Sequence, residues 1–171
     1  MIRKTDLQYG PEARNRLAET PDPSPAGARA ALESFYYALN NRNIEALSDD
    51  WADHPLVQLN NPLGGMLRGE DAVRELYERI FDGPIRVEVT FGDVVEYIGE
   101  RHAVFAGRET GTYTRSGDDA APLKIRTTRY FRYEDGAWRQ FHHHGSIEHA
   151  EALADYQRAA SAAGASRHDA G

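Results

Sequence analysis

The sequence contains no cysteine. This absence excludes disulfide bonds, thiolate nucleophiles and cysteine metal sites, and it fits a reducing compartment such as the cytoplasm. No run approaches the roughly 20 apolar residues that a membrane-spanning helix requires. The first six residues, Met1 to Asp6, turn polar at once, unlike the start of a signal peptide. We therefore expect a cytoplasmic protein with no membrane partner.

Basic residues are also in deficit, with 20 lysines and arginines against 27 aspartates and glutamates, and a formal net charge of −7. A protein that follows nucleic-acid phosphates is normally basic, so nucleic acid is not an expected partner. What the sequence does have is 40% hydrophobic residues over 171 positions. That combination is typical of one globular domain with a real core.

The composition divides the chain into three parts. Residues 1–24 are polar and end in Pro21-Asp22-Pro23-Ser24, which predicts a mobile tail or a loosely docked arm. Residues 25–147 carry the periodic patterns of a single domain. Residues 148–171 predict a terminal helix to about Ala160, followed by a fraying end rich in alanine, serine and glycine.

Three helices are predicted in the first half of the domain. Ser24 followed by Pro25 marks a helix start, and the helix ends at the run of residues 40–43. Asn43 caps a second helix from Ile44 to about Asp49. A third helix follows Gly69, and Asp82-Gly83-Pro84 ends it.

After Pro84 the hydrophobic period changes from helical to alternating, as in half-buried strands. Gly92-Asp93 interrupts the alternation and predicts a bulge or bend. Short links between the strands imply antiparallel neighbours, so helices followed by a meander predict an α+β fold with a curved antiparallel sheet around N-terminal helices and a pocket between them. The predicted strands are Leu56–Asn60, one from Ile85 past the bend, His102–Arg115, Leu123–Tyr133 and Ala137–Ile147.

One strand carries a distinctive pattern on a single face. Glu109 lies between Gly107 and Gly111, with the aromatic residues Phe105 and Tyr113 beyond them. Glycine inside a strand weakens it and often marks a place of close approach. We therefore predict an open space above Glu109.

Pairing the strands suggests partners for this glutamate. If Arg115 and Leu123 close one loop, Glu109 lies opposite Arg129, and opposed residues share a face. If Tyr133 and Ala137 close the next, Phe141 lies opposite Arg129 and His143 opposite Thr127. The resulting hypothesis is a pocket with three candidate catalytic residues, Glu109, Arg129 and His143, within an aromatic frame. The alternative is an ordinary exposed ion pair on the outer side of the sheet.

The other conspicuous residues have simpler interpretations. His142-His143-His144 raises the question of a metal, but alternation separates His143 from the other two, and no carboxylate clearly joins them, so no metal is expected. His142 and His144 are expected on a dimer-facing side with Thr128 and Gln140. The remaining candidates for the pocket wall are Phe35, Trp51, His54, Tyr77 and Phe81, of which all but His54 also fit a plain core.

Several stretches resemble the nuclear transport factor 2-like superfamily, chiefly its SnoaL-like branch and the association (hub) domain of calcium/calmodulin-dependent protein kinase II. The resemblance rests on Asn61-Pro62-Leu63-Gly64-Gly65 followed by Gly69, and above all on residues 128–146 with their Asp135-Gly136-Ala137-Trp138 turn. It implies a cone-shaped, cystatin-like α+β roll, a deep pocket and a homodimer formed through the open sheet face.

The resemblance also informs the pocket chemistry. The hub branch lines its pocket with arginines, and Arg129 matches one of them. Glu109 and Gly145 stand where two others would be, and Val73 replaces a pocket histidine, so the hub's anion pocket is not preserved here.

The family includes dehydratases, isomerases and cyclases as well as members without known chemistry, and fold does not fix function. One hypothesis is a cofactor-independent enzyme that moves protons on a small organic molecule. A second is a non-catalytic binding or dimerisation module, and a third is a structural dimer whose cone is filled.

Overall fold

The computed structural model describes residues 1–115 and 119–165, with side chains described as far as Ser161. Residues 116–118 of one predicted link and the predicted fraying end from residue 166 lie outside the described residues. The elements are β1 (Ile2–Thr5), η1 (Leu17–Glu19), α1 (Pro25–Asn41), α2 (Ile44–Asp50), β2 (Gln58–Asn60), β3 (Met66–Arg68), α3 (Glu70–Asp82), β4 (Ile85–Ile98), β5 (His102–Arg115), β6 (Ala121–Glu134), β7 (Ala137–Ile147) and α4 (Ala150–Ala165).

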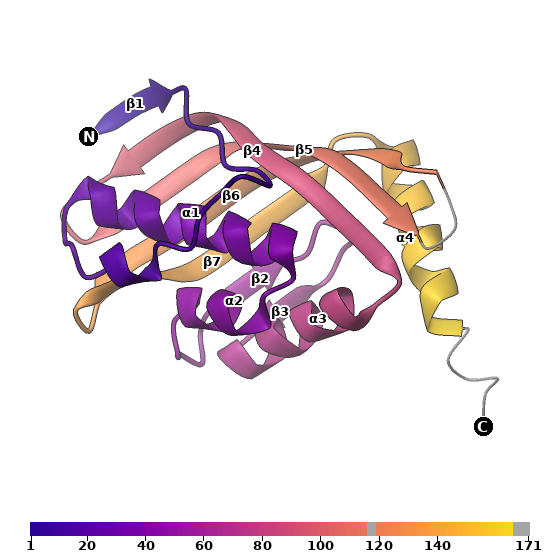
Figure 1. Ribbon diagram of the computed structural model, residues 1–171, viewed down its shortest axis with the longest axis horizontal. Helices are drawn as coiled ribbons and strands as arrows, with labels where there is room; N and C mark the ends of the chain where they lie inside the picture. Colours follow the sequence, from indigo (N-terminus) through magenta and orange to yellow (C-terminus); the bar gives the residue numbers. More distant parts are fainter. Residues whose placement is uncertain (116–118, 166–171) are drawn as a thin grey trace.

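A curved sheet carries the helices α1, α2 and α3 on one face (Figure 1). Within the described residues its strand order is β1-β4-β5-β6-β7-β2-β3. All neighbours are antiparallel except β2 and β7, which run parallel. The predicted α+β class and the central meander are confirmed, while β1 and β3 are strands that the sequence pattern did not reveal.

The predicted helix boundaries are confirmed closely. Ser24 accepts a hydrogen bond from the backbone N–H of Ala26, and Pro25 occupies the first turn of α1. The side chain of Asn43 caps α2 in the same way. These local capping bonds define the helix starts without help from distant residues, which is why the sequence predicts them well.

Two irregularities shape the sheet. The pairing of β4 with β5 shifts between Gly92 and Val95, and Asp93 has a positive φ of 52°, which confirms the predicted bend. A second shift, between Tyr130 and Phe131, leaves Phe141 as an extra residue on β7. Each bulge bends its strand and increases the local twist of the sheet.

The second bulge reverses part of a predicted face. Arg129 lies opposite His143 rather than Phe141, so that predicted pairing was wrong. Gln140 is fully buried on the inner side, not on the outer side beside Thr128 as expected. A simple two-residue alternation cannot anticipate one extra residue, which moves every side chain beyond it to the other face.

The predicted register between β5 and β6 was also wrong. Arg129 lies opposite Phe105, and Glu109 lies opposite Ile125, so the predicted pairing is displaced by four positions. The reason is that Pro122, read as part of a loop, continues the strand opposite Thr112. Because four is even, Glu109 and Arg129 still share the inner face.

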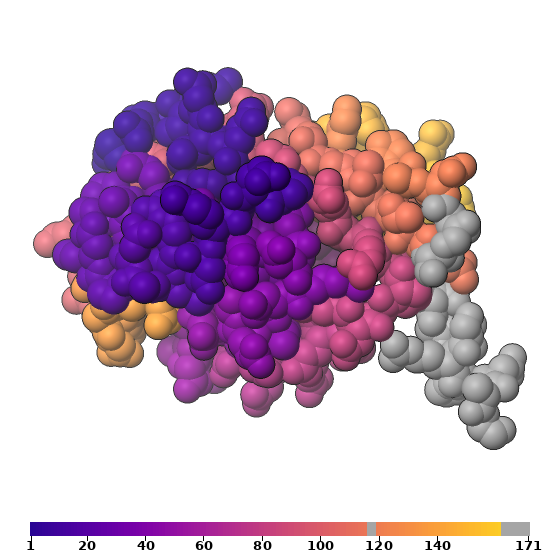
Figure 2. Space-filling model, in the orientation of Figure 1, coloured from indigo at the N-terminus to yellow at the C-terminus, as the bar shows by residue number. Residues whose placement is uncertain are grey.

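The N-terminal residues dock against the sheet, which fits the predicted alternative of a docked arm and not that of a mobile tail. Strand β1 pairs along β4, and Tyr9 forms an isolated bridge with Phe91. A buried carboxylate of α1 also binds this segment, because Glu33 accepts hydrogen bonds from Arg14 and Arg16. In Figure 2 these indigo residues lie against the body of the domain. Strand pairing and ion pairs fix the segment, rather than an apolar stripe, so the sequence pattern left both alternatives open.

None of the described helices is long and apolar enough to cross a membrane.

Candidate functional site

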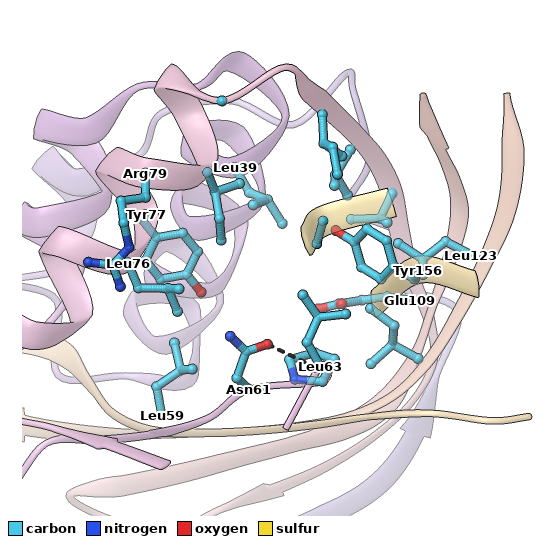
Figure 3. Close-up of a pocket in the computed structure, with 18 of the residues that line it drawn as sticks. Leu39, Leu59, Asn61, Leu63, Leu76, Tyr77, Arg79, Glu109, Leu123 and Tyr156 are labelled. Atoms are coloured by element: carbon cyan, nitrogen blue, oxygen red, sulfur yellow. Dashed lines mark hydrogen bonds between the residues drawn. The ribbon is translucent and has the colours of Figure 1, made fainter. Parts of the chain in front are cut away.

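A cavity of about 320 Å³ lies between α3, the inner face of the sheet and α4. Figure 3 looks into it, with Leu76 and Tyr77 on one side and Tyr156 on the other. Most of its wall is aliphatic. The aliphatic wall residues are Leu39, Leu59, Leu63, Leu76, Ile80, Ile85, Val87, Val89, Leu123, Ile125 and Ala160.

Three central strands supply the polar side chains at one end of the cavity, which we call its floor. Glu109 comes from β5, Arg129 from β6 and His143 from β7, and all three line the cavity. The structure therefore brings together the three candidate catalytic residues, although the predicted register was wrong. The side chains of Glu109 and Arg129 meet because Arg129 is long enough to reach diagonally across the ladder from its position opposite Phe105, and His143 is the cross-strand neighbour of Arg129.

Glu109 is held through one carboxylate oxygen. Its Oε1 accepts a 2.8 Å hydrogen bond from the hydroxyl of Tyr36 and a 3.0 Å bond from Nη2 of Arg129. Among the described residues, Oε2 has no hydrogen-bond partner, and the side chain faces the cavity (Figure 3). The carboxylate is thus fixed by one oxygen and leaves the other for a ligand.

Arg129 is buried and surrounded by partners. Its Nε donates to the hydroxyl of Tyr36 at 2.9 Å, and its Nη1 donates to Oε1 of Gln140 at 3.2 Å. The guanidinium carbon lies 3.4 Å from the ring centre of Phe35, a close cation–π contact. Burial lowers the pKa of Arg129, but Tyr36 and Glu109 outweigh it and raise the pKa above its usual value. The arginine therefore stays charged.

His143 is the third polar group of the floor. It is 4% exposed, and neither ring nitrogen has a hydrogen-bond partner among the residues that the structure describes. Burial, together with the charge of Arg129, holds the pKa of His143 well below its usual value. The imidazole is therefore neutral near pH 7, with one N–H to donate and one nitrogen to accept.

A second buried carboxyl group lies close to this system. Asp50, the last residue of α2, is fully buried, and neither of its oxygens has a hydrogen-bond partner within the described chain. Burial raises its pKa well above the usual value, although the charges of Arg129 and Arg139 oppose this. Asp50 is not part of the cavity wall. Its position between Asp49 and Trp51 gave no sign of such deep burial.

Only some of the residues predicted for the pocket wall line the cavity. Tyr77 lines the cavity, and burial raises its pKa to about 12. The other core aromatics predicted for the wall are buried in the core and do not line the cavity. These are Phe35, Trp51, Phe81, Phe105 and Tyr113, all buried.

Glu109 faces an open cavity as predicted, but Gly107 and Gly111 do not create that space. A Cβ atom on Gly107 would lie 3.0 Å from the ring of Phe91 and 2.7 Å from the carbonyl oxygen of Gly92. A Cβ on Gly111 would collide with the carbonyl oxygen of Glu88. The two glycines therefore allow β4 and its side chains to pack closely, and they do not open the pocket.

His54 and Phe141 lie outside the cavity. Their rings are 5.8 Å apart in a separate groove on the outer side of the sheet. Phe141 also lies 5.0 Å from the guanidinium of Arg132. The bulge at Phe141 is the reason, because it turns this side chain away from the floor.

Three contributors to the site were missed. Tyr36 and Gln140 bond Arg129, and Tyr156 of α4 lines the cavity. Helical periodicity alone does not separate Tyr36 from its neighbour Tyr37, and Gln140 was hidden by the bulge. No group of three or more histidine, aspartate or glutamate side chains within the described residues is arranged to hold a metal ion.

The cone-shaped fold with its interior cavity is that of the nuclear transport factor 2-like proteins. The SnoaL-like domain family matches residues 28–149, so the chain belongs to that family.

Solved structures agree with this assignment. A proposed calcium/calmodulin-dependent protein kinase type II association domain from Thiobacillus denitrificans is 28% identical, with a TM-score of 0.59, over 74% of this chain and 97% of that one. A proposed dehydratase of the nuclear transport factor 2-like family from Streptomyces avermitilis is 24% identical, with a TM-score of 0.62, over 77% and 100%.

A third structure extends the same likeness. A ketosteroid isomerase-like protein from Erwinia carotovora atroseptica is 20% identical, with a TM-score of 0.63, over 72% of this chain and 95% of that one. The second and third structures are similar in fold only. A comparison with curated proteins gives no match.

Proposed function

We propose that the chain binds a small, neutral, largely apolar organic molecule in the cavity and transfers a proton at the floor, with Glu109 as the base. One observation carries this proposal: Oε2 of Glu109 has no partner among the described residues, at the floor of a mainly aliphatic cavity. Convergent polar groups within an apolar cavity are the usual form of a small-molecule site.

The charge balance of the floor supports a neutral ligand. The single positive charge of Arg129 is matched by Glu109, with side chains that are 1% and 4% exposed. An anionic ligand would meet the negative Glu109 carboxylate on the floor, whereas the other arginine that lines the cavity, Arg79, is largely exposed and lies 3.9 Å from Glu75. A neutral molecule avoids that repulsion and buries its hydrocarbon part against the aliphatic wall.

The proposed chemistry uses the two free groups of the floor. Oε2 of Glu109 accepts a proton from a carbon next to a carbonyl group, while the neutral imidazole of His143 donates a hydrogen bond to the oxygen that gains charge. Return of that proton to a second carbon gives an isomerisation. Loss of a neighbouring hydroxyl, which leaves as water with the proton, gives a dehydration. Neither sequence requires a cofactor.

The test uses 5-nitrobenzisoxazole, a neutral bicyclic probe. A base removes its C3 proton, the ring N–O bond breaks, and the electron pair appears as a coloured phenolate. We expect the wild type to accelerate this reaction and Glu109→Gln to lose roughly 10²-fold or more of the acceleration. The matched control is Glu88→Gln, which changes an exposed carboxylate on β4. Equal rates for Glu109→Gln and the wild type would remove Glu109 from the mechanism.

A second candidate function is non-catalytic binding by the same cavity. The close bonding of Glu109 with Arg129 and Tyr36 favours it, because a buried ion pair can serve the fold alone. In that case a neutral bicyclic ketone would raise the melting temperature and be recovered unchanged, without exchange of its acidic protons.

We further propose that a second copy packs against the outer face of the sheet. The outer groove there combines apolar and aromatic side chains, including Phe141 and Leu56, which is 72% exposed. The similarity to a proposed association domain supports assembly through this domain. Light scattering should give twice the chain mass for the wild type and the single mass for Phe141→Glu. A monomeric wild type would refute the proposal.

A further inference from the structure

The helix α4 begins where the SnoaL-like domain ends. The family match stops at residue 149, and α4 starts at Ala150. Two of its residues, Tyr156 and Ala160, nevertheless form part of the cavity wall. The helix is therefore an addition to the family domain that completes the candidate site.

Several contacts fix α4 over the cavity. The side chain of Gln157 donates a 2.8 Å hydrogen bond to the carbonyl oxygen of Leu63, itself a wall residue on the turn between β2 and β3. The rings of Tyr156 and Tyr113 have centres 4.4 Å apart. Just before the helix, Glu148 forms an ion pair with Arg108 on β5. Contacts just before the helix and in its middle thus join α4 to the domain.

The hydroxyl of Tyr156 is left without a partner by these contacts. Its ring packs on Tyr113, but no described residue forms a hydrogen bond with its oxygen, and the residue lines the cavity. Figure 3 shows this hydroxyl directed into the space, on the side that also holds Glu109. Burial raises the pKa of Tyr156 to about 12, so the oxygen keeps its proton and can donate.

We infer that Tyr156 is a specificity-determining residue that donates a hydrogen bond to an acceptor oxygen on the ligand. The inference rests on the proposed binding function and adds the substrate class: a neutral, mainly hydrocarbon molecule with a carbonyl, ether or hydroxyl oxygen facing α4. Tyr36 of α1 bonds Arg129, and Tyr77 of α3 lines the cavity near Arg129. The hydroxyl of Tyr156 comes from α4, so it would contact the ligand at a different point from these two tyrosines.

A pair of matched ligands tests this role. 2-Acetylnaphthalene carries an acceptor oxygen, and 2-ethylnaphthalene has nearly the same shape without one. Dissociation constants by isothermal titration calorimetry should favour the acetyl compound for the wild type. In Tyr156→Phe, which keeps the ring on Tyr113, we expect this preference to fall by roughly threefold to tenfold, the size of one hydrogen bond. Affinity for the ethyl compound should stay the same.

The control variant is Tyr133→Phe. Its hydroxyl bonds the carbonyl oxygen of Pro21 and lies outside the cavity, so the ligand preference should equal that of the wild type. An unchanged preference in Tyr156→Phe would overturn the inference while leaving the binding function intact. Failure of both naphthalenes to bind the wild type would instead overturn the proposed function on which it rests.

Discussion

The hydroxyl of Tyr36 donates a 2.8 Å hydrogen bond to Oε1 of Glu109, which joins the first long helix to the middle of the sheet. The same hydroxyl oxygen accepts a 2.9 Å bond from Arg129. A single phenol therefore orders both members of the buried ion pair. It also directs the other carboxylate oxygen, Oε2, toward the cavity, where the proposed chemistry takes place.

Replacement of this phenol should destabilise the domain. In Tyr36→Phe both bonds are lost, and Nε of Arg129 is left without its acceptor, which should cost about 1–3 kcal/mol in the free energy of unfolding. Urea denaturation followed by circular dichroism measures this value. The control is Tyr37→Phe, whose hydroxyl forms no hydrogen bond within the described residues and should leave the midpoint unchanged. Equal midpoints for the two variants would show that the bridge adds nothing.

The ion pair itself should behave as a coupled unit. Arg129→Met leaves the Glu109 carboxylate buried without its cation. We expect the free energy of unfolding to fall by roughly 3–5 kcal/mol. Adding Glu109→Gln in the same chain removes the stranded charge and should restore part of that loss. A double-mutant cycle from urea midpoints measures the coupling. Strictly additive losses would contradict the buried pairing.

The stability of the wild type should fall below neutral pH because of His143. Its pKa is lowered in the folded state, so below about 6.5 the unfolded chain binds a proton that the folded chain does not. The contribution of the neutral His143 to the free energy of unfolding is fully present above that pH. It declines as pH falls, by up to about 1.4 kcal/mol per pH unit. His143→Gln should flatten the slope between pH 5 and 7. An identical slope in this variant would refute a neutral buried imidazole.

Asp50 should give the opposite dependence. Its pKa is raised in the folded state, so its contribution to stability is present below about pH 3.8 and is lost as pH rises toward the folded pKa. Asp50→Asn keeps the shape but cannot ionise, so it should gain stability relative to the wild type between pH 4.5 and pH 8. Thermal unfolding across that range checks the sign. If Asp50→Asn were instead less stable than the wild type, by an amount that grows with pH, the Asp50 carboxylate would have to be charged and paired.

The fold could be predicted from the sequence because its signals are local. Ser24, Asn43 and the glycine after Asp82 set the helix ends, and strict alternation identified the long strands. The N-terminal strand gave no such signal, because pairing with β4 and ion pairs to buried glutamates fix it.

The site could be predicted only in part. Glu109, Arg129 and His143 lie on one face in either register, since the error was an even number of residues for one pair of strands. The bulge at Phe141 removed that residue from the floor and brought Gln140 to it. Contacts from distant helices, those of Tyr36 and Tyr156, depend on the three-dimensional packing and leave no periodic mark.

In the proposed function, Glu109 moves a proton to and from a ligand carbon in the cavity. The direct measurement is deuterium incorporation into β-tetralone, a neutral bicyclic ketone, followed by proton NMR in D₂O. Glu109 would take a proton from the carbon next to the carbonyl and return a deuteron from solvent. We expect exchange faster than in buffer for the wild type and for Glu88→Gln, and exchange at the buffer rate for Glu109→Gln. Equally fast exchange with Glu109→Gln, or no acceleration by a wild type that binds the ketone, would contradict it.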